Sequence, residues 1–147
     1  MNGTLNWKRY AGVYILSMIG LMIVGLLLER LLGFSLPSGL SVVLPPMMAA
    51  LIEGQKRADA GLEPYGKAEA WSAASLATMV VGVITVAVLA GLLILMPLMC
   101  EMFSSISMIT WVLVFAGIMA LTLLVNRSFL TMGYKNQRKA LDKKAAK

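Results

Sequence analysis

Four long runs of apolar residues dominate the chain. The stretches without any charged residue are 10–28, 31–52, 70–100 and 102–126. A helix needs about 20 apolar residues to cross about 30 Å of hydrocarbon. The runs are apolar on every face, whereas a helix of a soluble bundle has a charged outer face. The pattern therefore predicts an all-α integral membrane four-helix bundle. It forms a single membrane domain over 1–147, with spans at about 10–30, 39–60, 70–97 and 104–127 and a basic tail at 128–147.

Composition supports this prediction. Of the 147 residues, 59% are hydrophobic and 14% are charged, whereas a soluble domain has about 25% charged residues. Lys8 and Arg9 resemble the basic start of a secretory signal. The apolar run after them is longer than the usual 7–15 residues or so, and no clear cleavage site precedes Glu29. We expect the first run to remain as a span.

The basic residues are distributed unequally between the two sides of the predicted bundle. The N-terminal arm, the central connection and the tail together carry twelve, and the other two connections carry only Arg30. Cytoplasmic connections of membrane proteins carry the excess of lysine and arginine. This asymmetry predicts that both termini are cytoplasmic. We take as possible partner or lipid contacts Arg57, Lys135, Arg138, Lys139, Lys143 and Lys144. The alternative is that the tail is a solvated topology determinant.

The second run contains Pro45 and Pro46, which have no backbone N–H to donate within a helix. One interpretation is a span that begins near Gly39 and kinks at the prolines, and this is the one we favour. The other is a short helix that begins at the prolines, after an irregular segment. Gly61 and Pro64 predict the helix end near residue 60.

Small residues recur every four positions in the second and third runs, so each set lies on one helical face. The sets are Pro46, Ala50, Gly54 and Ala58, and then Ala70, Ala74, Thr78 and Gly82. Such faces let membrane helices approach closely. We expect the second and third helices to form a tight antiparallel hairpin. On the second helix, Glu53 and Arg57 are spaced as i,i+4 partners.

One motif carries a resemblance to a known family. Glu53-Gly54-Gln55, a basic pair, and Gly61-Leu62-Glu63-Pro64 follow the second run. This segment and the four-span layout resemble an uncharacterised family of small four-span bacterial inner-membrane proteins. The resemblance implies a multi-pass protein of a bacterial inner (plasma) membrane, and it implies no activity.

Several residue types that carry chemistry are missing or isolated. The chain has no histidine and one cysteine, Cys100, so we expect no cofactor and no metal site. Cys100 is a small apolar filler or forms an intermolecular disulfide. No ionisable residue lies inside the four uncharged runs, and Glu101, at a span end, is the best candidate for a functional carboxylate. Serine and threonine of the fourth run, at 104, 105, 107 and 110, either line a polar path or bond back to their own helix.

These observations favour an accessory or structural membrane protein without catalytic activity. Its partners would be membrane lipids and another integral membrane protein or a second copy of the chain, and we expect no nucleic acid. The alternatives are a small oligomeric transporter or channel, and a holin-like or immunity-like membrane protein. A transporter normally needs an ionisable group inside the membrane, which the four runs do not supply.

Overall fold

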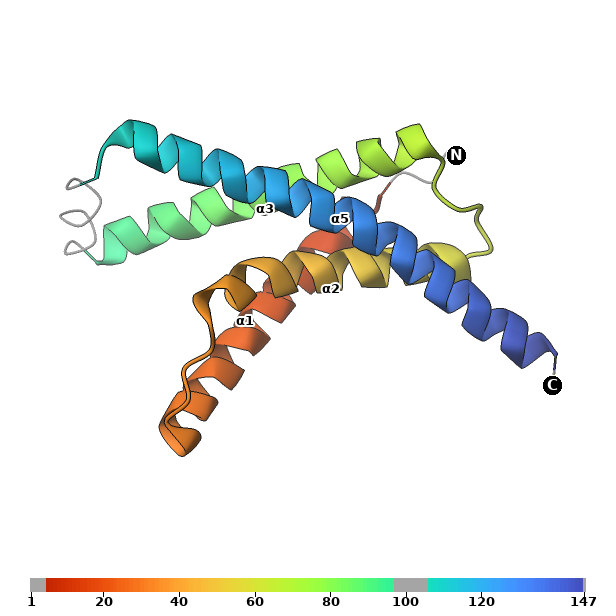
Figure 1. The fold of residues 1–147 in the computed structure, drawn as a ribbon, viewed down its shortest axis with the longest axis horizontal. Coiled ribbons are helices and arrows are strands. Elements are labelled where there is room, and N and C mark those ends of the chain that lie inside the picture. The colour runs from red at the N-terminus through yellow and green to blue at the C-terminus, as the bar shows by residue number, and fades with distance from the viewer. Residues whose placement is uncertain (1–4, 97–105, 147) are drawn as a thin grey trace.

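The computed structural model describes residues 5–96 and 106–146 and is all-helical over these ranges. Four helices follow one another, α1 (Trp7–Leu32), α2 (Ser38–Asp59), α3 (Lys67–Leu95) and α5 (Met108–Ala145) (Figure 1). Within the described ranges, α1, α3 and α5 are long and apolar enough to cross a membrane. The helix α2 does not join this group, because its second half is polar. Three candidate spans identify a membrane protein.

The helices end where the sequence supplies capping residues. Asn6 caps α1 by accepting a hydrogen bond from the backbone N–H of Arg9, at 3.2 Å. Gly33 follows α1 with φ 63°, and Gly61 follows α2 with φ 67°. Both are left-handed positions, which glycine adopts without a steric penalty. At α3 the side chain of Glu69 accepts a hydrogen bond from the backbone N–H of Gly66, at 3.4 Å.

The helix α2 runs without interruption through Pro45 and Pro46. It begins at Ser38, close to the predicted start, and ends at Asp59, just before Gly61. In Figure 1 the ribbon of its first turns is inclined to the rest of the helix. Both proline side chains are fully buried. They therefore lie in helix–helix contacts, where a ring without an N–H still contributes packing.

The packing order differs from the predicted one. The most extensive contact joins α2 to α5, followed by α1 to α2 and α3 to α5, and a smaller contact joins α1 to α3. We expected a tight hairpin of α2 and α3, and this is wrong. The partner of the small-residue face of α2 is α5, which lies far along the chain. The short connection between α2 and α3 favoured the hairpin prediction. The glycine that lies opposite Gly54, however, is Gly133 on α5.

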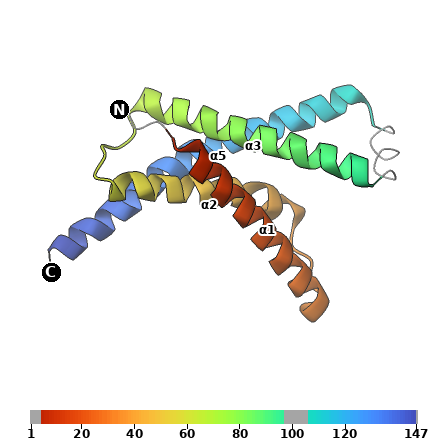
Figure 2. The ribbon, with the colours of Figure 1, turned by 180° about the vertical axis from the view of Figure 1, so that it is seen from behind.

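The four helices form a wedge. They come together around the start of α1, and the α2–α3 connection and the second half of α5 lie on the same side of this meeting region, with the start of α3 and the end of α5 apart from each other (Figure 1). We call this side the polar end. Away from it the pair α1 and α2 diverges from the pair α3 and α5, as the view from behind also shows (Figure 2). We call this the open end, which contains residues 33–37 and the facing ends of α3 and α5.

The last helix is longer than a membrane requires. It spans 38 residues, Met108–Ala145, which corresponds to about 57 Å at the usual rise of about 1.5 Å per residue. The basic segment that the sequence analysis separated as a tail is therefore the continuation of α5. Its charged side chains stand on a helix that extends beyond α2 (Figure 1).

Buried side chains gather where the helices converge. The core cluster consists of Leu5, Tyr10, Tyr14, Ala49, Ala50, Ala73, Ala74, Ala77, Val81 and Leu130. Five of its ten members are alanines, so the helices approach one another closely there. Near the open end large apolar side chains are exposed, such as Leu31 at 77%, Ile94 at 80% and Met108 at 80%.

Candidate functional site

The closest helix approach is a glycine–glycine crossing between α2 and α5. A Cβ atom added at Gly54 would contact the carbonyl of Leu130 and lie 2.9 Å from the backbone nitrogen of Tyr134. A Cβ added at Gly133 would contact the carbonyl of Leu51 and lie 3.0 Å from its Cα. Both neighbours are backbone atoms, so no rotamer change relieves the clash. The crossing exists because both helices carry glycine at the same level.

Next to this crossing, Glu53 joins α2 to the start of α1. Its carboxylate accepts hydrogen bonds from Arg9 Nε at 2.7 Å, from Arg9 Nη2 at 2.8 Å and from the backbone N–H of Asn6 at 3.0 Å. The Glu53 side chain is 5% exposed, and that of Arg9 is 39% exposed. A bidentate pair with an additional N–H satisfies a buried carboxylate well. The arrangement is suited to fixing the angle of α1 on α2.

A polar chain deeper in the bundle connects three helices. The Tyr10 hydroxyl donates to Asn126 Oδ1 at 2.7 Å, and Asn126 Nδ2 donates to the Thr78 hydroxyl at 3.2 Å. Thr78 donates in turn to the carbonyl of Ala74 at 2.8 Å. Tyr10 and Asn126 have no exposed surface. Amide–hydroxyl bonds between membrane helices contribute about 0.6 kcal/mol each on average, so this chain determines orientation more than stability.

Arg57 organises the α2–α3 connection. Its Nε donates to the carbonyl of Glu63 at 2.7 Å, its Nη2 pairs with Glu69 at 2.8 Å, and its guanidinium lies 3.9 Å from the centre of the Tyr65 ring. Burial raises the pKa of the Tyr65 hydroxyl, and the charge of Arg57 opposes that rise in pKa. The phenol stays neutral at physiological pH. Tyr134 of α5 also reaches this connection, because its hydroxyl donates to the carbonyl of Leu62 at 2.9 Å.

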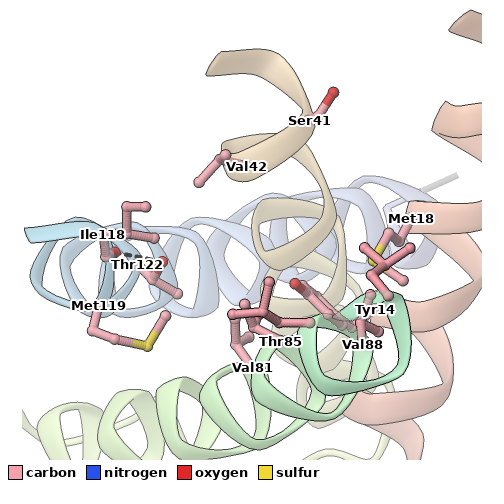
Figure 3. Close-up of a pocket in the computed structure, with 12 residues that line it drawn as sticks. Tyr14, Met18, Ser41, Val42, Val81, Thr85, Val88, Ile118, Met119 and Thr122 are labelled. Carbon is pink, nitrogen blue, oxygen red and sulfur yellow. Dashed lines mark hydrogen bonds between the residues drawn. The ribbon is translucent and has the colours of Figure 1, made fainter. Parts of the chain in front are cut away.

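A cleft of about 280 Å³ opens above this junction, between the two diverging helix pairs. All four described helices line it, with Tyr14 and Met18 from α1, Val42 from α2, Val81 and Val88 from α3, and Met119 and Thr122 from α5 (Figure 3). The lining is mostly apolar. Its hydroxyls come from Tyr14, Ser41, Thr85 and Thr122. The Thr122 hydroxyl donates to the carbonyl of Ile118 at 2.8 Å, so its proton is used within α5.

The residues predicted to pack helices occupy helix contacts to different degrees. Those that are buried are Pro46, Ala50, Gly54, Ala58, Ala70 and Ala74, whereas Thr78 and Gly82 are half-buried. A Cβ atom at Gly82 would lie 3.4 Å from Met119 Sδ, so this position also faces α5. The structure thus gives both small-residue faces the same neighbour, α5, and does not pair them with each other.

The residues predicted to contact partners or lipid fall into two groups. Arg57 is 8% exposed and is used in the α2–α3 connection. The sequence analysis paired it with Glu53 along one helix, whereas the structure links Glu53 to α1 and Arg57 to α3. The exposed group on the continuation of α5 consists of Lys135, Arg138, Lys139, Lys143 and Lys144. Arg138 pairs with Asp142 at 3.5 Å on the same helix.

Sequence reasoning missed Tyr10, Asn126 and the role of Arg9. A signal for Asn126 was present, because it is an amide at the last position of an apolar run. Polar groups in such runs usually bond to a neighbouring helix. Arg9 gave no comparable signal, because a basic residue before a first span is also expected from topology alone.

Some predictions fall on residues 97–105, outside the described part of the chain, namely Cys100, Glu101 and the serines at 104 and 105. Within the described residues, no group of three or more metal-ligating side chains lies together. No family model matches the chain, and neither a curated protein nor a solved structure matches it. The resemblance to small four-span membrane proteins stays a prediction.

Proposed function

We propose that this chain is an accessory membrane protein whose cleft receives an apolar helix of another integral membrane protein. The observation that carries the proposal is the wedge shape. All four described helices line the cleft between its two arms, so an occupant of the cleft would contact every one of them. Contacts at the polar end fix the helices relative to one another, and the cleft between the diverging helix pairs supplies the contact surface.

The cleft fits side chains of a helix better than a transported molecule. Its volume of about 280 Å³ lies at the lower limit of the roughly 300–1,000 Å³ of small-molecule sites. Its lining is apolar, and the nearby carboxylate of Glu53 is already engaged by Arg9. A helix lying across the cleft could insert a few side chains between α3 and α1. These features favour the accessory protein over the transporter.

We further propose that both termini are cytoplasmic, in a bacterial inner membrane. The α2–α3 connection and the end of α5 lie on the same side of the molecule (Figure 1), and the backbone N–H of Asn6 bonds to Glu53 in the second half of α2 at 3.0 Å, which supports a shared side. The described basic residues other than Arg30 belong to that side. The test is a reporter that is active only in the periplasm, fused after Lys147. High activity of this fusion would contradict the proposed topology.

The partner can be tested by photo-crosslinking in cells. A photoreactive residue at Val88, which lines the cleft, is expected to crosslink to one membrane protein; at Leu16, which is exposed on α1 outside the lining, it should not. The identified protein is then purified with the chain, and Thr85→Trp, which fills the cleft, should abolish their association. A crosslinked dimer of this chain would replace the partner by a second copy. Equal crosslinking at both positions would refute the cleft as the contact.

A further inference from the structure

A second hollow lies at the polar end and differs in chemistry from the apolar cleft. It has a volume of about 300 Å³, and its exposed lining is as polar as it is apolar. Its lining residues are Tyr65, Lys67, Ala70, Arg127, Ser128 and Thr131. It therefore lies between the start of α3 and the point where α5 leaves its apolar segment. None of these residues takes part in the proposed cleft contact.

Two cations of this hollow have no acidic partner among the described residues. Arg57 engages the nearby carboxylate of Glu69, at 2.8 Å. Arg127 lies with its guanidinium 4.3 Å from the centre of the Trp71 ring, which fixes the side chain without neutralising its charge. Lys67 is exposed at the first residue of α3, where the helix dipole also favours an anion. The hollow therefore has a net positive charge of two that no described side chain compensates.

One hydroxyl group adds a hydrogen-bond donor at the same place. Thr131 donates its proton to the carbonyl of Ser128 at 2.8 Å, so it has none left for a phosphate, and the available hydroxyl is that of Ser128. Ser128 is exposed one residue after Arg127. Arginine, lysine and hydroxyl donors around one hollow are the groups that bind a phosphate.

The surroundings indicate a phosphate that is attached to a lipid. Trp71 is 40% exposed and lies beside Arg127, as tryptophan does at the boundary between hydrocarbon and headgroups. Leu124 and Leu121 precede Ser128 by one and two helical turns and so continue the same face of α5. They are 53% and 48% exposed. An acyl chain can lie along these leucines while its headgroup occupies the hollow.

We infer that the hollow between Lys67 and Arg127 binds the phosphate of an anionic phospholipid. Lipid bound there contacts both α3 and α5 and stabilises their pairing at the polar end. The site is separate from the lysines further along α5, which a diffuse electrostatic attraction would use equally. This inference does not depend on the accessory role, because it needs only a membrane at the level of Trp71.

The test uses the full chain in a non-ionic detergent and measures its thermal precipitation. Phosphatidylglycerol is titrated in, with phosphatidylcholine of the same acyl chains and inorganic phosphate as parallel titrations. Phosphatidylglycerol alone is expected to raise the transition temperature. In Lys67→Gln/Arg127→Gln, the lipid concentration for half of the effect should rise about fivefold for each removed charge. The matched control Lys139→Gln/Lys143→Gln loses the same charge elsewhere on α5 and should respond like the parent.

Three outcomes would overturn the inference. Equal stabilisation by phosphatidylcholine would show that charge is not recognised, and stabilisation by inorganic phosphate alone would show that no lipid is needed. An equal loss in the control variant would show a diffuse attraction. Because Arg127 also contacts Trp71, the single variant Lys67→Gln is measured as well. It should keep the parent's transition temperature without lipid and still show the weaker response.

Discussion

The polar end and the open end of the wedge use different means to hold helices together. At the polar end the backbones of α2 and α5 touch at Gly54 and Gly133, and directional bonds fix α1 on α2. At the open end the same helices expose large apolar side chains to their surroundings. In lipid an exposed leucine gains no hydrophobic free energy by packing against protein, because lipid tails are equally apolar. Close backbone approach and polar bonds therefore decide where such helices meet.

Gly54→Ala and Gly133→Ala are expected to lower the stability of the polar end more than any other variant considered below. Each adds one Cβ atom against the backbone of the opposite helix, so the helices must move apart. We expect a loss of about 3 kcal/mol of unfolding free energy, measured by unfolding in mixed detergent. Gly91→Ala and Gly117→Ala are the matched controls, because their added atoms meet nothing within 4 Å. If all four variants behave alike, the polar end is not held by the glycine crossing.

Arg9→Gln comes next, because it leaves the Glu53 carboxylate buried without its cation. The loss should be about 2 kcal/mol, less than for a fully buried pair, because Arg9 is 39% exposed. The double variant Arg9→Gln/Glu53→Gln should recover part of this loss, since no charge then remains uncompensated. Unfolding of the two single variants and the double variant measures the coupling. Additive losses would show that the two side chains do not act as a pair.

Asn126→Leu should have a smaller effect, about 1 kcal/mol, because it removes two interhelical hydrogen bonds. Asn136→Leu on the same helix is the control, since Asn136 is exposed. The more sensitive measurement is the distance between spin labels on α1 and α3. We expect the distribution of this distance to broaden in Asn126→Leu only. An unchanged distribution would mean that packing alone orients α1.

Ile94→Ala, near the open end, is expected to change stability by less than about 0.5 kcal/mol in detergent. The side chain is 80% exposed and contributes little to contacts within the chain. Ala74→Leu, which overfills the core, is the contrasting variant, with an expected loss of about 2 kcal/mol. A large loss in Ile94→Ala under the same conditions would show that the open end is occupied in the purified protein.

The amino-acid sequence by itself determined that the chain is helical and belongs in a membrane. Uncharged runs long enough to cross a bilayer leave few alternatives, because a backbone in lipid must satisfy its own hydrogen bonds. The helix end at Gly61 was equally local, since a left-handed position after a helix favours glycine. The small-residue faces of α2 and α3 were also visible in the sequence as regular spacings.

The tertiary structure decided which faces meet. Small-residue faces resemble one another, so their spacing does not show which helix packs against which. The short connection to α3 suggested α3 as the partner of α2, whereas α2 packs mainly against α5. Gly133 became the partner of Gly54 only once two distant segments were placed side by side. The ion pair of Glu53 also depended on the tertiary structure. Its spacing in the sequence suggested Arg57 as the partner, whereas its partner in the structure is Arg9. Pairings between distant residues depend on the arrangement of whole helices, which no local pattern specifies.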